Sequence, residues 1–232
     1  MTLDQDPWAP EELHPDLVPH LTTTDGAAPM ACLHHPLIVS VPYSPQLNKM
    51  LNAQYAHKTA ALSKAFQAGD RNAFVYLHER HYRIQALHHI IGSGWLHDPA
   101  NYWPLVASVW TDSENIWQNL QLWRQLWSRH ATNRHEAMDD NERAALEALP
   151  ETITIFRGVR DPSHFKGLSW TTDEAKAHWF ANRFSSPNNG LTPRVIRGRI
   201  HKRHVLAHFL NRGESEIVCL PQFASTSKDA LK

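Results

Sequence analysis

The sequence predicts an α+β protein, because helical and strand-like patterns occupy different parts of the chain. Apolar residues recur at helical spacing through much of residues 46–149, whereas short β-branched segments dominate residues 150–220. The first 45 residues are rich in proline. We therefore expect an extended arm at 1–45, a helical region at 46–149 and a core with a mixed sheet at 150–232, with the helices packed on that sheet and possibly forming one compact unit with it.

The composition is that of a packed protein without a strong overall charge. The 232 residues are 42% hydrophobic and 20% charged, with a formal net charge of zero and 17 histidines. No global basic field therefore favours nucleic acid or membranes as partners. The two cysteines, Cys32 and Cys219, are far apart, so we expect no disulfide framework and a reducing compartment. With neither a signal-like start nor a membrane-length apolar run, we expect a cytoplasmic protein.

Proline dominates the N-terminal arm and excludes long helices from it. The prolines are Pro7, Pro10, Pro15, Pro19, Pro29, Pro36, Pro42 and Pro45. Leu37–Val41 is the one short strand expected there.

Two helices are expected between the arm and residue 92. The first runs from Gln46 to Gly69 and carries apolar residues at near-helical spacing, namely Leu47, Leu51, Tyr55, Leu62 and Phe66. The second covers about residues 71–91 and stops at a Gly-Ser-Gly sequence. It contains four histidines without the acid-plus-histidine pattern of a zinc helix. We therefore predict no metal site.

Tryptophan is concentrated in the segment that follows. The rings are Trp95, Trp103, Trp110, Trp117, Trp123 and Trp127. We expect a helix capped by Asp112 or Ser113, with Trp123 and Trp127 on its buried face. Core packing is the expected use of the rings, and the alternative is an aromatic surface for a partner or a base. A further short helix, capped by residues 139–142, should end at Leu149.

After Pro150 the sequence predicts strands. Residues 152–157 form a β-branched strand that ends in Arg157-Gly158, and residues 168–172 form a second, hydroxyl-rich segment after a loop at 161–167. A helix should begin at about Asp173, with Thr171 and Glu174 in capping-box register. Its inward residues are expected to be Ala177, Phe180, Ala181 and Phe184.

Two more strands are expected after a polar loop at 185–193. In residues 194–200, Ile196 and Ile200 should share one face and Arg197 and Arg199 the other. Residues 205–210 form a further strand or turn. The basic run at 194–203 is expected to be a solvated face, with a phosphate or nucleic-acid contact as the alternative.

Two acids, Glu214 and Glu216, stand at the start of the last apolar run. If that run is a strand, its period of two puts both carboxylates on one face. Like charges repel, so such a pair persists near neutral pH when it is exposed or has cationic or hydroxyl partners. One carboxylate could then stabilise a cationic transition state while the other orients or deprotonates a nucleophile. The alternative is a solvated strand end.

Together, Arg157, the Ser169-Trp170-Thr171 segment and the Glu214/Glu216 pair resemble the Arg / Ser-Thr-Ser / Glu-x-Glu pattern of the mono-ADP-ribosyltransferases related to arginine-modifying bacterial toxins. The resemblance covers about residues 150–220 and implies an ADP-ribosyltransferase core. Trp170 replaces the middle residue of the hydroxyl motif, and we expect it to face the protein core.

The resemblance implies that NAD is the substrate and that no metal takes part. Glu216 would stabilise the positive charge that develops on the ribose as the nicotinamide bond breaks, because a carboxylate there binds the transition state more tightly than the ground state. Ser169 would order Glu216 and the ribose, and Thr171 would support the cleft wall. Arg157 would bind the pyrophosphate, with Gly158 leaving room for the ligand.

The resemblance also implies an acceptor. A glutamate at the position of Glu214 goes with arginine acceptors in this family, and it would align or deprotonate the attacking group. The preceding loop, with Phe209, Asn211 and Arg212, corresponds to the substrate-recognition loop. The expected partner is a target protein with an acceptor arginine, and the basic strand leaves a nucleic-acid acceptor open.

Three functions remain open at this point: transfer of ADP-ribose to a protein, hydrolysis of NAD by water, and a non-catalytic binding or inhibitory role on the same fold. The non-catalytic role is disfavoured because all four motif residues are present, namely Arg157, Ser169, Glu214 and Glu216. The resemblance suits a toxin-like effector of a phage or bacterium that acts in a host or target-cell cytosol.

Overall fold

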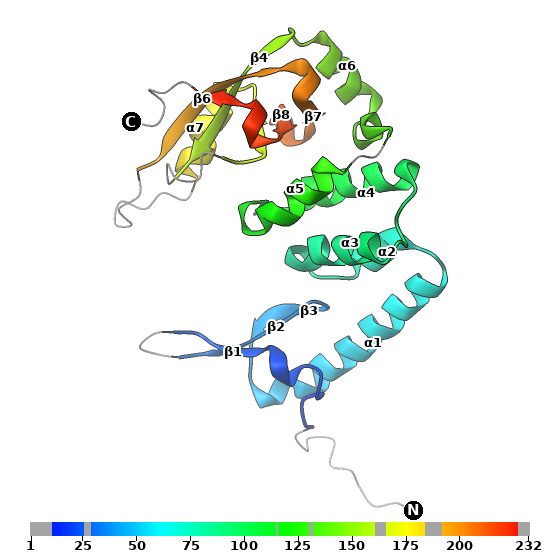
Figure 1. Ribbon diagram of the computed structural model, residues 1–232. Coiled ribbons are helices and arrows are strands. Elements are labelled where there is room, and N and C mark those ends of the chain that lie inside the picture. The colour runs from blue at the N-terminus through cyan, green and yellow to red at the C-terminus, as the bar shows by residue number, and fades with distance from the viewer. Residues whose placement is uncertain are drawn as a thin grey trace, which may run out of the picture. The chain divides into compact units, whose positions relative to one another are not determined.

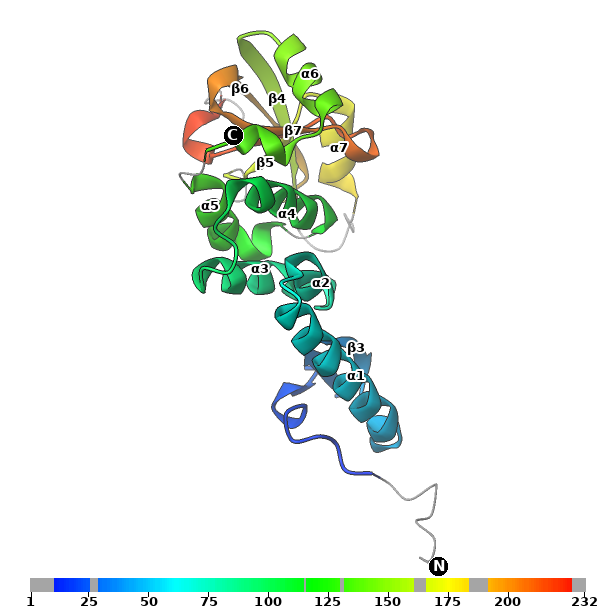
Figure 2. The same ribbon diagram turned by 90° about the vertical axis from the view of Figure 1, so that its right-hand side faces the viewer.

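A computed structural model describes residues 11–25, 29–114, 116–129, 132–160, 166–183 and 192–226 (Figures 1 and 2). The protein is α+β, as predicted. It divides into two compact units, residues 1–95 and residues 96–232. These boundaries differ from the expected ones. The proline-rich arm belongs with the first helices, and the later helices belong with the large sheet.

The N-terminal unit contains a three-stranded antiparallel sheet in place of the expected extended arm. Its strands, in the order β1-β2-β3, are β1 (Leu21–Thr23), β2 (Ala31–His35) and β3 (Ile38–Pro42). The prolines fit this sheet because Pro36 lies in the turn between β2 and β3 and Pro42 ends β3. A separate core joins the sheet to the first helix, and its buried residues are Leu17, Leu33, Ile38 and Leu51.

Three helices complete this unit: α1 (Asn48–Gln67), α2 (Arg71–Tyr76) and α3 (Arg83–Gly92). The expected first helix is confirmed as α1. The expected second helix is wrong in one respect, since it is interrupted between α2 and α3. There the amide of Glu79, in extended conformation, donates to the carbonyl of Pro36 at 2.7 Å. A tertiary hydrogen bond thus replaces helical ones that the local periodicity favours.

The second unit begins with three helices: α4 (Pro99–Asp112), α5 (Leu120–Ser128) and α6 (Asp140–Ala148). Asp112 and Ser113 end α4 and do not cap the next helix, so that prediction is wrong. The cap at the start of α6 is confirmed, because Asp139 and Glu142 form a reciprocal capping box. In both views α4 and α5 lie side by side next to the large sheet (Figures 1 and 2).

Four tryptophans form the core between these helices, which confirms packing as their main use. Trp103, Trp110, Trp123 and Trp127 are each at most 1% exposed. Trp110 meets Trp123 edge to face, with ring centroids 4.9 Å apart. Each aromatic pair of this kind adds about 0.5–1.5 kcal/mol beyond its buried area. Trp117, by contrast, is 59% exposed.

The large sheet has six strands in the order β7-β8-β5-β4-β6-β9. Their bounds are β4 (Thr152–Val159), β5 (Ser169–Thr171), β6 (Arg194–His201), β7 (Val205–Phe209), β8 (Glu216–Cys219) and β9 (Ser225–Thr226). Every ladder among the described residues is antiparallel, so the expected mixed sheet is not found. The two strands joined by the helical crossover, β5 and β6, run parallel but are separated by β4.

That crossover contains α7 (Glu174–Asn182), which packs mainly on β4. Its N-cap is Asp173, whose carboxylate accepts from the amides of Ala175 and Lys176, so the expected capping box of Thr171 and Glu174 is wrong. Ala177 and Ala181 are buried, as expected, and Phe180 is partly buried. Phe184 lies outside the described residues, as do loop residues 161–165 and 185–191.

The inner face of the sheet follows the predicted alternation. Ile196 and Ile200 are buried while Arg197 and Arg199 are exposed, and Trp170 faces this core as expected. The two cysteines are buried and free. None of the helices in the described ranges combines the length and the apolarity needed to cross a bilayer.

Candidate functional site

The three strands β4, β5 and β8 bring the motif residues together within the second unit. β5 lies between the other two, with Thr171 opposite Phe156 of β4 on one side and opposite Glu216 of β8 on the other. Arg157 and Glu216, which are 59 residues apart in sequence, therefore lie on the two strands that flank β5.

Arg157 is held by its own neighbours. Its Nη1 donates to the carbonyl oxygen of Ser169 at 2.6 Å. A Cβ atom at Gly167 would overlap the guanidinium, so the glycine provides the space in which the guanidinium lies. Burial lowers the pKa of Arg157, and the nearby carboxylate of Glu216 opposes this effect. The side chain is thus a partly buried cation within electrostatic range of Glu216.

The pKa of Glu216 is set by groups that act in opposite directions. Burial raises the pKa of its carboxyl, and the charge of Glu214 raises it further. Three groups act in the opposite direction: hydrogen bonds from Ser169 and Trp110, and the charge of Arg157. The indole Nε1 of Trp110, on α4, donates to Oε2 of Glu216 at 3.2 Å. Shifted carboxyl groups with named partners are typical of functional sites.

Glu214 reaches this cluster by a route that differs from the prediction. It does not lie on β8, because it follows the short 3-10 helix Asn211–Gly213 and has helical dihedral angles. Ser215, between the two acids, has a φ of 43°. Strand alternation therefore does not place the two acids on one face, and that part of the prediction is wrong. A turn brings them close instead, which is why Glu214 affects the pKa of Glu216.

The hydroxyl group of Thr171, on β5, holds this turn in place. Thr171 is buried, and its Oγ1 donates to the carbonyl oxygen of Glu214 at 2.5 Å and accepts from the amide of Asp173 at 3.0 Å. Thr171 therefore holds the acid-bearing loop to the start of α7.

Ser215 belongs to a hydrogen-bond network that sequence reasoning missed. Its Oγ lies 2.6 Å from Oγ1 of Thr172 and 3.0 Å from Nε2 of His208. His208 is 2% exposed, and burial lowers its pKa. Its Nδ1 has no hydrogen-bond partner within the described part of the chain. A histidine in an apolar strand gave no signal of this role in the sequence.

Trp110 is the other functional neighbour that the sequence did not reveal. It was expected to pack in the core, and it does, but its indole N–H also contacts the central carboxylate. The two residues are 106 positions apart. Only the tertiary packing of α4 on the sheet brings them into contact.

Two of the expected ligand-binding residues have structural tasks instead. A Cβ at Gly158 would overlap the backbone of Ala177 and Ala181, so this glycine is required by the packing of α7 on β4. Phe209 is 3% exposed and lies against Trp127, with ring centroids 6.3 Å apart. The structure therefore places neither residue where the prediction needs it.

The rest of the expected recognition loop is at the surface. Asn211 is exposed, and the backbone of Arg212 forms part of the 3-10 helix, while its side chain lies outside the described atoms. Among the described residues, no three His, Cys, Asp or Glu side chains are grouped as metal ligands would have to be.

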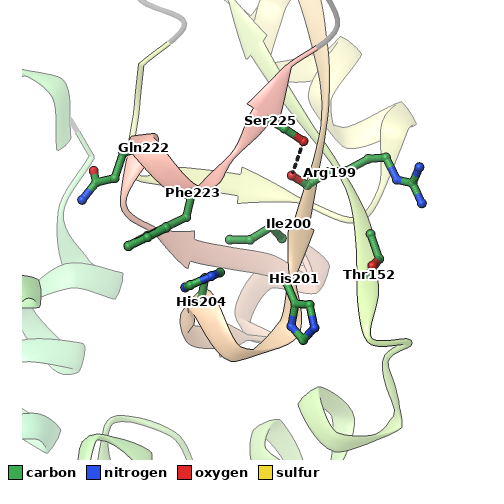
Figure 3. Close-up of a pocket in the computed structure, with 8 residues that line it drawn as sticks. All are labelled: Thr152, Arg199, Ile200, His201, His204, Gln222, Phe223 and Ser225. Carbon is green, nitrogen blue, oxygen red and sulfur yellow. Dashed lines mark hydrogen bonds between the residues drawn. The ribbon is translucent and has the colours of Figure 1, made fainter.

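A hollow of about 510 Å³ lies elsewhere on the same unit (Figure 3). Its lining includes Thr152, Arg199, His201, His204, Gln222 and Phe223. None of the motif residues borders it, so the hollow and the Arg157–Ser169–Glu216 cluster are separate features. Comparisons of the chain with known protein families, curated proteins and solved structures found no match.

Proposed function

We propose that this protein is a mono-ADP-ribosyltransferase that moves ADP-ribose from NAD to an arginine side chain of a target protein. The observation that carries the proposal is the cluster of Glu216 with the hydroxyl of Ser169 and the guanidinium of Arg157. Cleavage of the nicotinamide–ribose bond develops positive charge on the ribose. A preorganised carboxylate near that charge stabilises the transition state more than the ground state.

Within this proposal each side chain has a distinct task. Ionised Glu216 faces the developing cation and accepts a hydrogen bond from a ribose hydroxyl. Ser169 and Trp110 hold the carboxylate in one orientation, which their hydrogen bonds to it support. Arg157 favours the ionised form of Glu216 and adds positive charge for the pyrophosphate.

Glu214 is the residue proposed to act on the acceptor. Its carboxylate can pair with an incoming guanidinium and take up the proton as the nitrogen attacks. Its position on a turn, held through its own carbonyl by Thr171, leaves the side chain partly exposed. A nucleophile that approaches from solvent can therefore meet Glu214 near Glu216.

Hydrolysis of NAD by the same residues is the second candidate, and the burial of Phe209 favours it. The expected aromatic contact for an acceptor protein is packed against Trp127. A site with weaker acceptor recognition would pass more of its ADP-ribose to water.

The test is incubation of the full chain with NAD labelled in the adenylate, with and without a cell lysate. Nicotinamide release and label on protein are measured separately. We expect both, and Glu216→Gln should reduce both by roughly 10²- to 10³-fold. Glu214→Ala should reduce labelling of protein more than nicotinamide release. The matched control is Glu147→Gln, which removes an exposed carboxylate on α6.

The outcomes separate the candidates. Label on protein supports transfer, and free ADP-ribose alone supports hydrolysis. If NAD is not consumed under any condition, the enzymatic proposal is wrong and a binding role on this fold is favoured. Wild-type turnover by a folded Glu216→Gln variant would also contradict it.

A further inference from the structure

Positive charge is concentrated on one segment of the second unit. Residues 194–204 include five arginines and lysines, two histidines and no acid. On β6 the buried residues alternate with the exposed Arg197 and Arg199. Residues two apart on a strand lie about 7 Å from each other, so the outer face presents a row of guanidinium groups. The formal net charge of the chain is zero, and this charge is therefore local.

An aromatic platform lies on the other side of β6 from this row, at the hollow that Arg199 also borders. Phe223 is 40% exposed and stacks on His204, with ring centroids 4.2 Å apart and an angle of 3° between the rings. Nε of Arg203 donates to Nε2 of His204 at 3.1 Å and so fixes that ring. Figure 3 shows the His204–Phe223 pair on one side of β6 and Arg199 on the other, both at the hollow.

One acid modulates the positive charge from outside the segment. Glu151 lies 3.7 Å from Nζ of Lys202 and 3.8 Å from Nε2 of His201. Its side chain is 74% exposed, and exposed ion pairs of this kind contribute about 1 kcal/mol or less. The carboxylate therefore offsets part of the charge of Lys202.

We propose that single-stranded nucleic acid binds around the edge of β6 at this hollow, with Arg197 and Arg199 on one side of the strand and Arg203 and the His204–Phe223 pair on the other. Guanidinium groups bind backbone phosphates, and an unpaired base stacks on the exposed ring of Phe223. A duplex cannot offer such a base without being opened. An acidic polypeptide has the charge for the arginines but no flat ring for the platform. This inference does not depend on the proposed enzymatic function.

The test is fluorescence anisotropy of the full chain with three labelled probes: a 12-nucleotide uridine RNA, a 12-nucleotide thymidine DNA and a 12-base-pair duplex. Both single strands should bind more tightly than the duplex. Three phosphate contacts predict a slope of about −2 for log K against log salt. The affinity should therefore fall roughly 20-fold between 50 and 200 mM salt. The difference between the RNA and the DNA reports whether the 2′-hydroxyl is recognised.

Matched variants assign the binding to this surface. Arg199→Ala with Arg203→Ala should weaken binding about tenfold or more and reduce the salt slope by about 1.4. Lys49→Ala with Lys64→Ala removes the same charge from exposed positions on α1 and should change little. Phe223→Leu keeps apolar volume but loses the ring, so it should weaken single-strand binding roughly 5- to 150-fold. Glu151→Gln should strengthen binding.

Several results would overturn the proposal. They are no binding at 50 mM salt, preference for the duplex, or equal losses in the arginine and lysine double variants. Equally tight binding of a poly-glutamate peptide would assign the surface to acidic polypeptides. Thermal unfolding of each variant checks that the fold is kept, which is expected because the altered side chains are largely exposed.

Discussion

Glu216 shows at the residue scale how a buried carboxyl group weakens the fold that holds it. Burial is the main cause of its raised pKa, and the partners Ser169, Trp110 and Arg157 compensate incompletely. A carboxyl whose folded pKa is raised favours the folded state while it is protonated. That contribution is complete below the ordinary pKa of about 4.5 and is lost as the pH rises through the folded value.

The raised pKa of Glu216 predicts how the stability of a variant depends on pH. Glu216→Gln cannot ionise, so its stability relative to the wild type should increase as the pH rises from 4 to 8. The change should be on the order of 1 kcal/mol for each unit by which the pKa is raised. Urea unfolding at several pH values measures it, with Glu147→Gln as the control. A constant difference across this pH range would show that the pKa of Glu216 is not raised by folding.

The residues of this site could be predicted only in part from the sequence. Arg157, Ser169 and Glu216 were identifiable by residue type and order, because they belong to three consecutive motifs. Their partners Trp110 and Gly167 were not identifiable. An indole in a buried helix and a glycine in a loop have no local signature, and their roles follow from tertiary contacts alone.

At the scale of elements, the loop between β7 and β8 determines the geometry of the two acids. Ser215 adopts a left-handed φ of 43°, which is uncommon for a residue with a side chain. Hydrogen bonds of its hydroxyl to Thr172 and His208 hold it there. The turn therefore depends on Thr172, which follows β5, and on His208 of β7 as well as on its own sequence.

Replacement of Ser215 tests this dependence. Ser215→Ala should lower the free energy of unfolding by about 1–3 kcal/mol, because Nε2 of buried His208 loses its partner. Ser215→Gly should lose less, since glycine adopts a positive φ without strain. Chemical denaturation measures both, with Ser128→Ala at the exposed end of α5 as the control. If alanine and glycine are both neutral, the network does not hold the turn.

The elements themselves were largely predictable where a local signal decides them. The capping box of α6 and the alternation of β6 are confirmed because both depend on residues close in sequence. The interrupted α2–α3 segment and the Glu214 turn were predicted wrongly. In each case contacts from another element, Pro36 for the first and Thr171 for the second, replace the local pattern.

At the scale of the whole molecule, the two units have separate cores. One is built around Leu33 and Ile38, and the other around Ile155, Trp170 and Ile217. The sequence could not reveal this division, because periodicity shows which face of an element is apolar but not which elements share a core. For the same reason the proline-rich segment was expected to be an arm, although it forms a sheet with α1 beneath it.

The N-terminal unit should be strongly acid-sensitive because of His35; His208, in the second unit, has a pKa that burial also lowers. His35 is 8% exposed, and burial lowers its pKa to about 4, with His20 and His78 contributing and Asp16 opposing. A histidine with a lowered folded pKa stabilises the fold fully above about 6.5 and loses this contribution as the pH falls toward the folded value. The expected loss between pH 6.5 and 4 is on the order of 2 kcal/mol.

Amide hydrogen exchange of the full chain measures the loss of stability on acidification separately for each of the two units. Protection of β2 and β3 should decline on acidification before that of β4 and β6. His35→Asn can still accept the hydrogen bond from the amide of Leu37 and should flatten the dependence. His57→Asn, at an exposed position of α1, should leave it unchanged. Simultaneous loss of protection in both units would contradict the assignment to His35.

Gly167 has a consequence for tracing the ancestry of this chain. Any side chain at that position would push the guanidinium of Arg157 away from the carbonyl of Ser169. A diverged homologue that places this arginine in the same way must keep a glycine two places before its serine, even if most of its other positions have changed. A search for distant homologues should therefore require the motif Arg, then Gly-x-Ser-x-Thr, then Glu-x-Glu. The glycine should be its most informative position.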